Sequence, residues 1–143
     1  MSVPLQEKNL LRHQGYINGQ WQDADNHRVY PVINPATGET LATVADMGVR
    51  ETEAAIAAAD QAWPAWRALT AKARSEILKR WFGLIRAHAE DLAQLITAEQ
   101  GKPLAESRGE VGYGASFIEW FAEEAKRAYG SVIPSPLGDR MLL

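Results

Sequence analysis

Three glycines lie close together at Gly109, Gly112 and Gly114, where backbone N–H groups could bind a phosphate. Nucleotide-binding glycines follow a strand and have the order G-x-G-x-x-G. Here the order is G-x-x-G-x-G, and the preceding residues, LAESR, favour a helix. We therefore expect the glycines to lie inside a helix, where the missing side chains let another backbone approach closely. The pattern does not indicate a nucleotide loop.

Other residues with catalytic or metal-binding chemistry are scattered along the chain. His13, His27 and His88 are far apart and lack the spacing of metal ligands. The chain has no cysteine, hence neither a disulfide nor a thiolate nucleophile. Glu99 is an acid beside an apolar face at a predicted helix end, which fits a structural ion or a capped backbone. The residues alone predict no catalytic and no cofactor-binding group.

The composition limits the partners that the chain could have. Its 143 residues are enough for one domain with a hydrophobic core. The net charge is −3 and no cluster of Lys and Arg stands out, so neither nucleic acid nor an anionic membrane is an expected partner. No apolar run has the length of a signal peptide or a membrane span, which favours a cytoplasmic location.

Two hairpins are predicted to form a short β-rich part near the N-terminus. Asn18 and Gly19 form the strongest short hairpin signal, because both turn positions need positive φ. Strands over 29–33 and 40–45 make the second hairpin, and Pro31 indicates an edge strand or a bulge.

The rest of the chain has the period of a helix. Pro64 should end or kink the first helix, and Thr70 is the expected N-cap of the second. Gly101 is the expected residue after the third helix. The four helices are predicted over 50–63, about 71–88, 90–100 and 104–129.

Aromatic and charged residues of these helices have simple structural roles in this prediction. Trp63, Trp66 and Trp81 have the spacing of core residues. Glu123 and Arg127 are four residues apart and are expected to pair on an exposed helix face.

Four motifs resemble the N-terminal part of aldehyde dehydrogenases, and the last two resemble the succinate-semialdehyde dehydrogenase group: YINGQW, INPATGE, EQGKPLAE and SFIEWFAEEAKRAYG. The resemblance runs from about residue 15 to residue 143. It implies an α/β fold of the aldehyde dehydrogenase type, with two hairpins (16–47) followed by about four helices (49–130). It also implies a division into an N-terminal extension (1–15), the N-terminal part of the cofactor-binding domain (16–130) and the truncated start of the oligomerisation strand (131–143).

The activity implied by this resemblance is NAD(P)-dependent oxidation of succinate semialdehyde to succinate. A cysteine attacks the aldehyde to form a thiohemiacetal, and water activated by a glutamate hydrolyses the resulting thioester. In relatives these groups and the cofactor-binding residues follow the point that matches Leu143. The chain therefore resembles an N-terminal segment that is inactive alone and binds neither NAD nor NADP. The complete enzyme is expected to be a homo-oligomer, a dimer or tetramer, acting on a small aldehyde.

The resemblance also implies two candidate sites. Tyr113 and Phe117 match positions that line a substrate tunnel, although a role as core residues fits them equally well. The backbone carbonyl of Ile33 and the carboxylate of Glu99 match ligands of a structural monovalent cation, with Val32 where some relatives have threonine.

A second interpretation of the chain is a non-catalytic interaction module that pairs with dehydrogenase subunits. In either case the strand at 131–143, if unpaired, predicts self-association.

Overall fold

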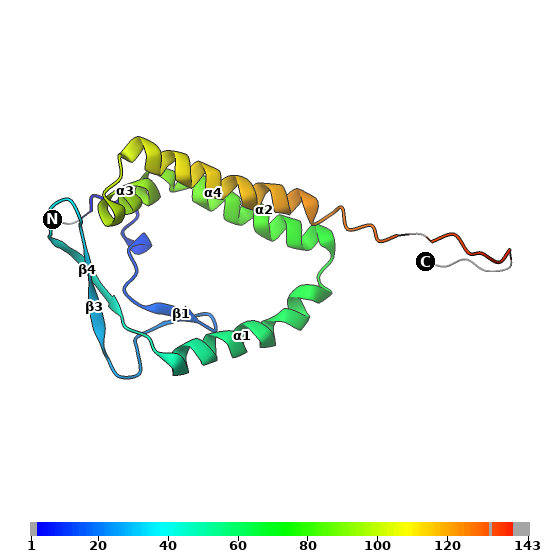
Figure 1. Ribbon diagram of the computed structural model, residues 1–143, viewed down its shortest axis with the longest axis horizontal. Coiled ribbons are helices and arrows are strands. Elements are labelled where there is room, and N and C mark those ends of the chain that lie inside the picture. Colours follow the sequence, from blue (N-terminus) through cyan, green and yellow to red (C-terminus); the bar gives the residue numbers. More distant parts are fainter. Residues whose placement is uncertain (1–2, 132, 139–143) are drawn as a thin grey trace.

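The structure is a computed structural model that describes residues 3–131 and 133–138. Two hairpins precede four α-helices within this part of the chain, which confirms the predicted α/β order (Figure 1). The elements are η1 (Lys8–Leu10), β1 (Gly15–Ile17), β2 (Gln20–Gln22), β3 (Val29–Ile33), β4 (Thr40–Ala45), α1 (Val49–Ala68), α2 (Ala71–Ala87), α3 (Ala89–Gln100) and α4 (Leu104–Glu124).

The first hairpin has the two-residue turn that the sequence predicts. Asn18 has φ 49° and Gly19 has φ 79°, so both residues occupy the left-handed region. Strands β1 and β2 pair antiparallel, and the rings of Tyr16 and Trp21 lie opposite each other with centroids 5.1 Å apart.

The second hairpin has the predicted bounds. Pro31 lies opposite Thr43, in a sheet of two strands where each strand has a free edge. Proline is tolerated there because its missing N–H interrupts no central ladder. The pairing register shifts between Val32 and Ile33, so the strand also carries the predicted irregularity, directly after the proline.

Helix α1 continues through Pro64 to Ala68, so the first predicted alternative, an end at the proline, is wrong. The other alternative, a kink at Pro64, stays a prediction. Proline removes the N–H that would bond to the carbonyl of Asp60. Both residues are exposed, and water can satisfy that carbonyl. Thr70 caps α2 as predicted, because its hydroxyl accepts a hydrogen bond from the N–H of Ala73 at 3.2 Å.

Helices α2, α3 and α4 pack together, with α4 alongside both of the others (Figure 1). The buried face of α4 consists mainly of small residues: Ser107, Val111, Ala115 and Ala122. The hydroxyls of Ser107 and Thr97 join α4 to α3 with a hydrogen bond of 2.8 Å. Helix α4 ends at Glu124, five residues before the predicted end at residue 129.

Two of the tryptophans predicted to be core residues are exposed. Trp63 and Trp81 each keep 54% of their surface accessible, and Trp66 is half-buried. Helical spacing places the two exposed rings on faces of α1 and α2 that no other described element covers. Their position in the core was therefore predicted wrongly.

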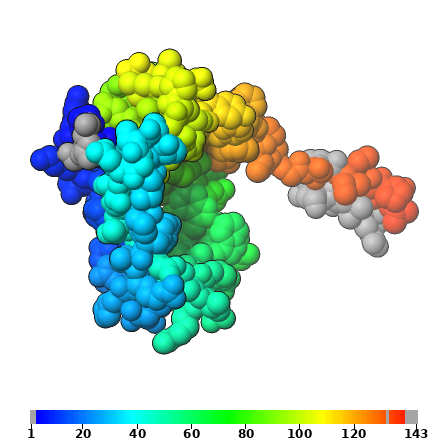
Figure 2. All heavy atoms as spheres, turned by 60° about the vertical axis from the view of Figure 1, so that its left-hand side comes forward, coloured from blue at the N-terminus to red at the C-terminus, as the bar shows by residue number. Residues whose placement is uncertain are grey.

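The C-terminal segment projects away from the helices (Figures 1 and 2). The described residues of the predicted strand, 131 and 133–138, contain a single bridge at Ile133 and no continuous strand. Residues 132 and 139–143 of the predicted oligomerisation strand lie outside the described residues. That strand and the predicted domain boundaries remain predictions.

Candidate functional site

Helix α4 carries an exposed row of aromatic side chains opposite its small buried residues. We call Tyr113, Phe117, Trp120 and Phe121 the aromatic face. Tyr113 is 68% exposed and Phe117 is 47% exposed, so neither is a core residue of the part of the chain that the structure describes. Their rings form an edge-to-face pair with centroids 4.8 Å apart. Such a pair favours a fixed mutual orientation of the two rings.

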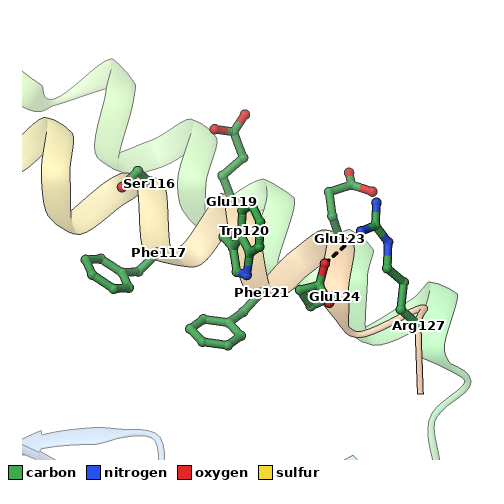
Figure 3. A pocket seen from close by; sticks show the side chains of 8 residues that line it. All are labelled: Ser116, Phe117, Glu119, Trp120, Phe121, Glu123, Glu124 and Arg127. Carbon is green, nitrogen blue, oxygen red and sulfur yellow. Dashed lines mark hydrogen bonds and ion pairs between the residues drawn. The ribbon is translucent and has the colours of Figure 1, made fainter.

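A depression of about 650 Å³ lies beside this row (Figure 3). Phe117 lines it and Tyr113 does not. The rings of Phe117 and Phe121 project from the same side of α4, while the carboxylate of Glu119 points away from them. All lining residues belong to α4 or follow it directly: Ser116, Phe117, Glu119, Trp120, Phe121, Glu123, Glu124 and Arg127. The lining therefore combines three aromatic side chains with five polar or charged ones, all from α4 and the turn that follows it.

The glycines of α4 lie inside the helix, as predicted, but they are not close to another backbone. A Cβ atom added at Gly109, Gly112 or Gly114 would meet no heavy atom within 4 Å beyond the helix's own turn. Contact with α2 and α3 is made instead by the buried residues of α4, such as Val111 and Ala115. Within the described residues the prediction of a close approach is wrong, because no other described segment lies against these glycines.

An ion-pair cluster lies at the C-terminal end of α4. Glu123 pairs with Lys79 of α2 at 2.6 Å and with Lys126 at 2.7 Å. Hydrogen bonds from Lys126 and then Lys79 lower the pKa of Glu123 to about 2. Arg127 pairs with Glu124 at 3.0 Å, so the predicted Glu123–Arg127 pair is wrong. Two lysines, one of them from α2, engage Glu123 instead.

The residues of the predicted cation site come from two elements. Ile33 ends β3 beside the register shift, and Glu99 lies in the last turn of α3. The side chain of Glu99 is exposed at the wall of an apolar depression of about 470 Å³. The described residues contain no group of three or more His, Cys, Asp or Glu side chains that could hold a metal ion. The two-residue site remains a prediction.

The three histidines have separate surroundings. His13 forms a hydrogen bond through Nδ1 to the carbonyl oxygen of Thr43 at 2.7 Å. His27 occupies a turn with φ 55°, and His88 lies at the junction of α2 and α3. None of the three belongs to the aromatic face.

The sequence analysis missed two buried carboxylates that hold distant backbone segments. Glu51 accepts hydrogen bonds from the N–H groups of Asp25 at 2.8 Å and Gly48 at 2.9 Å. Asp91 accepts hydrogen bonds from the N–H groups of Gln6 and Glu7. These backbone donors stabilise the ionised carboxylates and lower the pKa of Glu51 and of Asp91.

The position of each acid in its helix was the available signal. Glu51 and Asp91 are each the third residue of a helix, where an acid also opposes the helix dipole. In the part of the chain that the structure describes, no helix combines the length and the apolar character needed to cross a bilayer.

Comparison with known proteins extends these observations. The pattern of the aldehyde dehydrogenase family matches residues 21–143. The glutarate-semialdehyde dehydrogenase of Pseudomonas putida is 60% identical over 141 residues, which are 99% of this chain and 29% of that protein. The succinate-semialdehyde dehydrogenase GabD of Escherichia coli, named as NADP(+)-dependent, is 57% identical over the same shares of both chains.

Solved structures agree with the sequence matches. An NADP-dependent enzyme of E. coli superposes with a TM-score of 0.92 and 57% identity, covering 96% of this chain and 28% of that one. The succinate-semialdehyde dehydrogenase of Burkholderia pseudomallei also gives a TM-score of 0.92, at 54% identity, over 96% of this chain and 29% of its own. This chain therefore spans less than a third of the length of these relatives.

Proposed function

Because the chain belongs to the aldehyde dehydrogenase family, we propose that it forms the N-terminal part of an NAD(P)-dependent enzyme that oxidises succinate semialdehyde to succinate. The observation that carries this proposal is the 57% identity to a succinate-semialdehyde dehydrogenase over 99% of the chain. The match includes α4 and its aromatic face. We propose that the complete protein works as a homo-oligomer.

The names of the relatives support a substrate with an aldehyde at one end and an acidic group at the other. They include dehydrogenases of glutarate semialdehyde at 60% identity, succinate semialdehyde at 57% and 3-sulfolactaldehyde at 51%. Succinate and glutarate semialdehydes differ by one methylene. A hydrophobic pocket distinguishes such a pair by about 10–200-fold, so an assay with both substrates is informative.

The chemical step needs groups that this chain does not contain. The proposed nucleophile is a cysteine thiolate, and these 143 residues include no cysteine. Nor do the glycines form a cofactor cradle: Gly109, Gly112 and Gly114 lie inside α4, where the backbone N–H groups belong to the helix. We therefore place the nucleophile, the general base and the cofactor site outside these residues.

The contribution of this chain is one wall of the substrate tunnel. The edge-to-face pair of Tyr113 and Phe117 presents apolar rings on a rigid helix. Such a surface guides a small aldehyde by packing against its methylene groups, and it offers no nucleophile that attacks the carbonyl carbon. The second proposed contribution is a structural monovalent cation bound by the carbonyl of Ile33 and the carboxylate of Glu99, where Val32 offers no side-chain oxygen.

Steady-state kinetics of the full-length protein test this proposal. We expect turnover of succinate semialdehyde with NAD or NADP, and a rise in KM of several-fold for Phe117→Ala. The matched control is Tyr129→Ala, an exposed aromatic residue beyond the end of α4. Absence of turnover with both cofactors and both semialdehydes would overturn the assignment. Equal KM values for Phe117→Ala and Tyr129→Ala would contradict the tunnel role of Phe117 and leave the proposed activity standing.

The exposed aromatic face also supports a second candidate function, a non-catalytic module that pairs with dehydrogenase subunits. The intact mass of the natural polypeptide separates the two. A mass several times 15.8 kDa supports the enzyme, whereas a mass near 15.8 kDa supports the module.

A further inference from the structure

The first residues of the described chain form a segment that links the helices to the hairpins. We call residues 3–14 the N-terminal strap. It passes beside α3, includes η1 and leads into β1, so it spans two parts of the molecule (Figure 1, blue). Nothing in the proposed activity requires this segment, and its contacts suggest a separate role.

One end of the strap is held by a single buried carboxylate. The two oxygens of Asp91 accept the N–H of Gln6 at 3.0 Å and the N–H of Glu7 at 2.8 Å. Asp91 is only 3% exposed. Because a buried charge is costly without partners, the carboxylate and the two N–H groups depend on each other.

The other end of the strap is held by the hairpins. The carbonyl oxygen of His13 accepts the N–H of Ala45 at 2.8 Å, and the ring of His13 bonds to Thr43. The guanidinium of Arg12 lies 4.6 Å from the centre of the Trp21 ring. These contacts are independent of Asp91.

The middle of the strap is held mainly by its own hydrogen bonds. The carboxylate of Glu7 accepts the N–H of Asn9, and the N–H of Leu10 bonds to the carbonyl of Glu7.

Val3 and Pro4 line a depression of about 330 Å³ together with Leu41 of β4 and Leu104 of α4. The strap thus forms one wall of a small apolar cavity between the hairpin and the helices.

We propose that the strap is a latch: Asp91 holds it closed against α3, and the loss of this one contact releases residues 3–11 without unfolding the helices. Release would open the wall formed by Val3 and Pro4 and expose Leu41 and Leu104. The hairpins would keep the far end in place through His13. Local opening of this kind has a lower free-energy cost than global unfolding.

Amide hydrogen exchange and trypsin cleavage of the chain test the latch. In Asp91→Asn, the new NH₂ group meets at least one backbone N–H, so at least one of the two hydrogen bonds is lost. We expect exchange at Gln6 and Glu7, and cleavage after Lys8 and Arg12, to be about tenfold faster or more. Amides of α2 and α4 should keep their exchange rates. The control is Glu106→Gln, an exposed acid in the first turn of α4.

A second pair of variants removes the contact from the side of the strap. Gln6→Pro eliminates one N–H donor, while Gln6→Ala keeps it and changes only the side chain. The latch predicts faster trypsin cleavage after Lys8 in the proline variant alone. Equal cleavage of the two Gln6 variants would overturn the proposal. The proposal would also be overturned if Asp91→Asn accelerated hydrogen exchange equally at the amides of α2, of α4 and of the strap. Asp91 would then support only the global stability of the chain.

Discussion

Single carboxylates connect parts of this chain that are far apart in sequence. Glu51 joins the N-terminal end of α1 to the turn after β2, and Asp91 joins α3 to the N-terminal strap. Glu123 joins α4 to α2 through Lys79. Each acid is stabilised in its ionised form by its partners, so acid should weaken all three connections.

Glu123 gives the clearest pH dependence. Its pKa in the folded chain is lowered from the ordinary 4.5 to about 2. Its ion pairs therefore stabilise the fold fully above pH 4.5, and this stabilisation is lost as the pH falls toward 2. We expect the melting temperature from circular dichroism to fall over this window, and to fall less in Glu123→Gln. The side chain is partly exposed, so high salt should reduce the difference. Identical acid profiles of the two proteins would contradict this expectation.

At the scale of single residues, turns and helix caps were predictable from the sequence, whereas hydrogen bonds between distant residues were not. Asn18 and Gly19 define their turn because the turn needs two adjacent residues with positive φ, and these two residue types adopt it readily. Thr70 likewise caps the helix that begins directly after it. The partners of Asp91 lie 84 and 85 residues away, and no spacing rule connects them.

At the scale of elements, α4 shows the limit of helical periodicity. The sequence places apolar residues on two sides of this helix, and the period does not say which side is buried. The buried side is the one with small residues, such as Ala115 and Ala122, because α4 can approach α2 and α3 more closely there. Tyr113 and Phe117 consequently lie on the exposed side. Their candidate role came from the family resemblance and not from the pattern.

Substitution of a glycine in α4 tests whether the helix surface around Gly112 is uncovered. A methyl group at Gly112 meets no neighbour, so Gly112→Ala should remove backbone entropy from the unfolded state and stabilise the chain by about 0.5–1 kcal/mol. The control is Ala115→Gly, which lies on the buried face and should destabilise the chain. Urea unfolding followed by circular dichroism measures both changes. Destabilisation by Gly112→Ala would show that this face is covered in solution.

At the scale of the whole molecule, much apolar surface is exposed. The aromatic face of α4, Trp63 and Trp81 have no cover among the described residues. The two dehydrogenases of P. putida and E. coli named above are more than three times as long, since this chain spans 29% of each. Exposed surface of this kind marks a site of association.

The isolated chain should therefore self-associate. We expect sedimentation velocity to show species heavier than 15.8 kDa that increase with concentration. Replacing Phe117 and Phe121 with serine should shift the distribution toward the monomer, while Tyr129→Ser should leave it unchanged. A single 15.8 kDa species at all concentrations would contradict this prediction.

The order of two hairpins and four helices was predictable because each element depends on local signals. How these elements are arranged was not, since the arrangement depends on contacts such as Glu51 to Asp25. The motif resemblance supplied the family, and the comparison with known proteins confirms it. The division into an extension, a cofactor-binding part and an oligomerisation strand still rests on that resemblance.

The hydrogen bonds of Asp91 also bear on how the protein is made. The strap leaves the ribosome before its acceptor, which is synthesised 84 and 85 residues later. A contact that closes a loop of this length forms more slowly than the neighbouring helices, whose contacts are local. Residues 3–11 are therefore translated before Asp91 and are among the last to reach their native place. During this interval the N–H groups of Gln6 and Glu7 lack their native acceptor, and the segment stays accessible to chaperones.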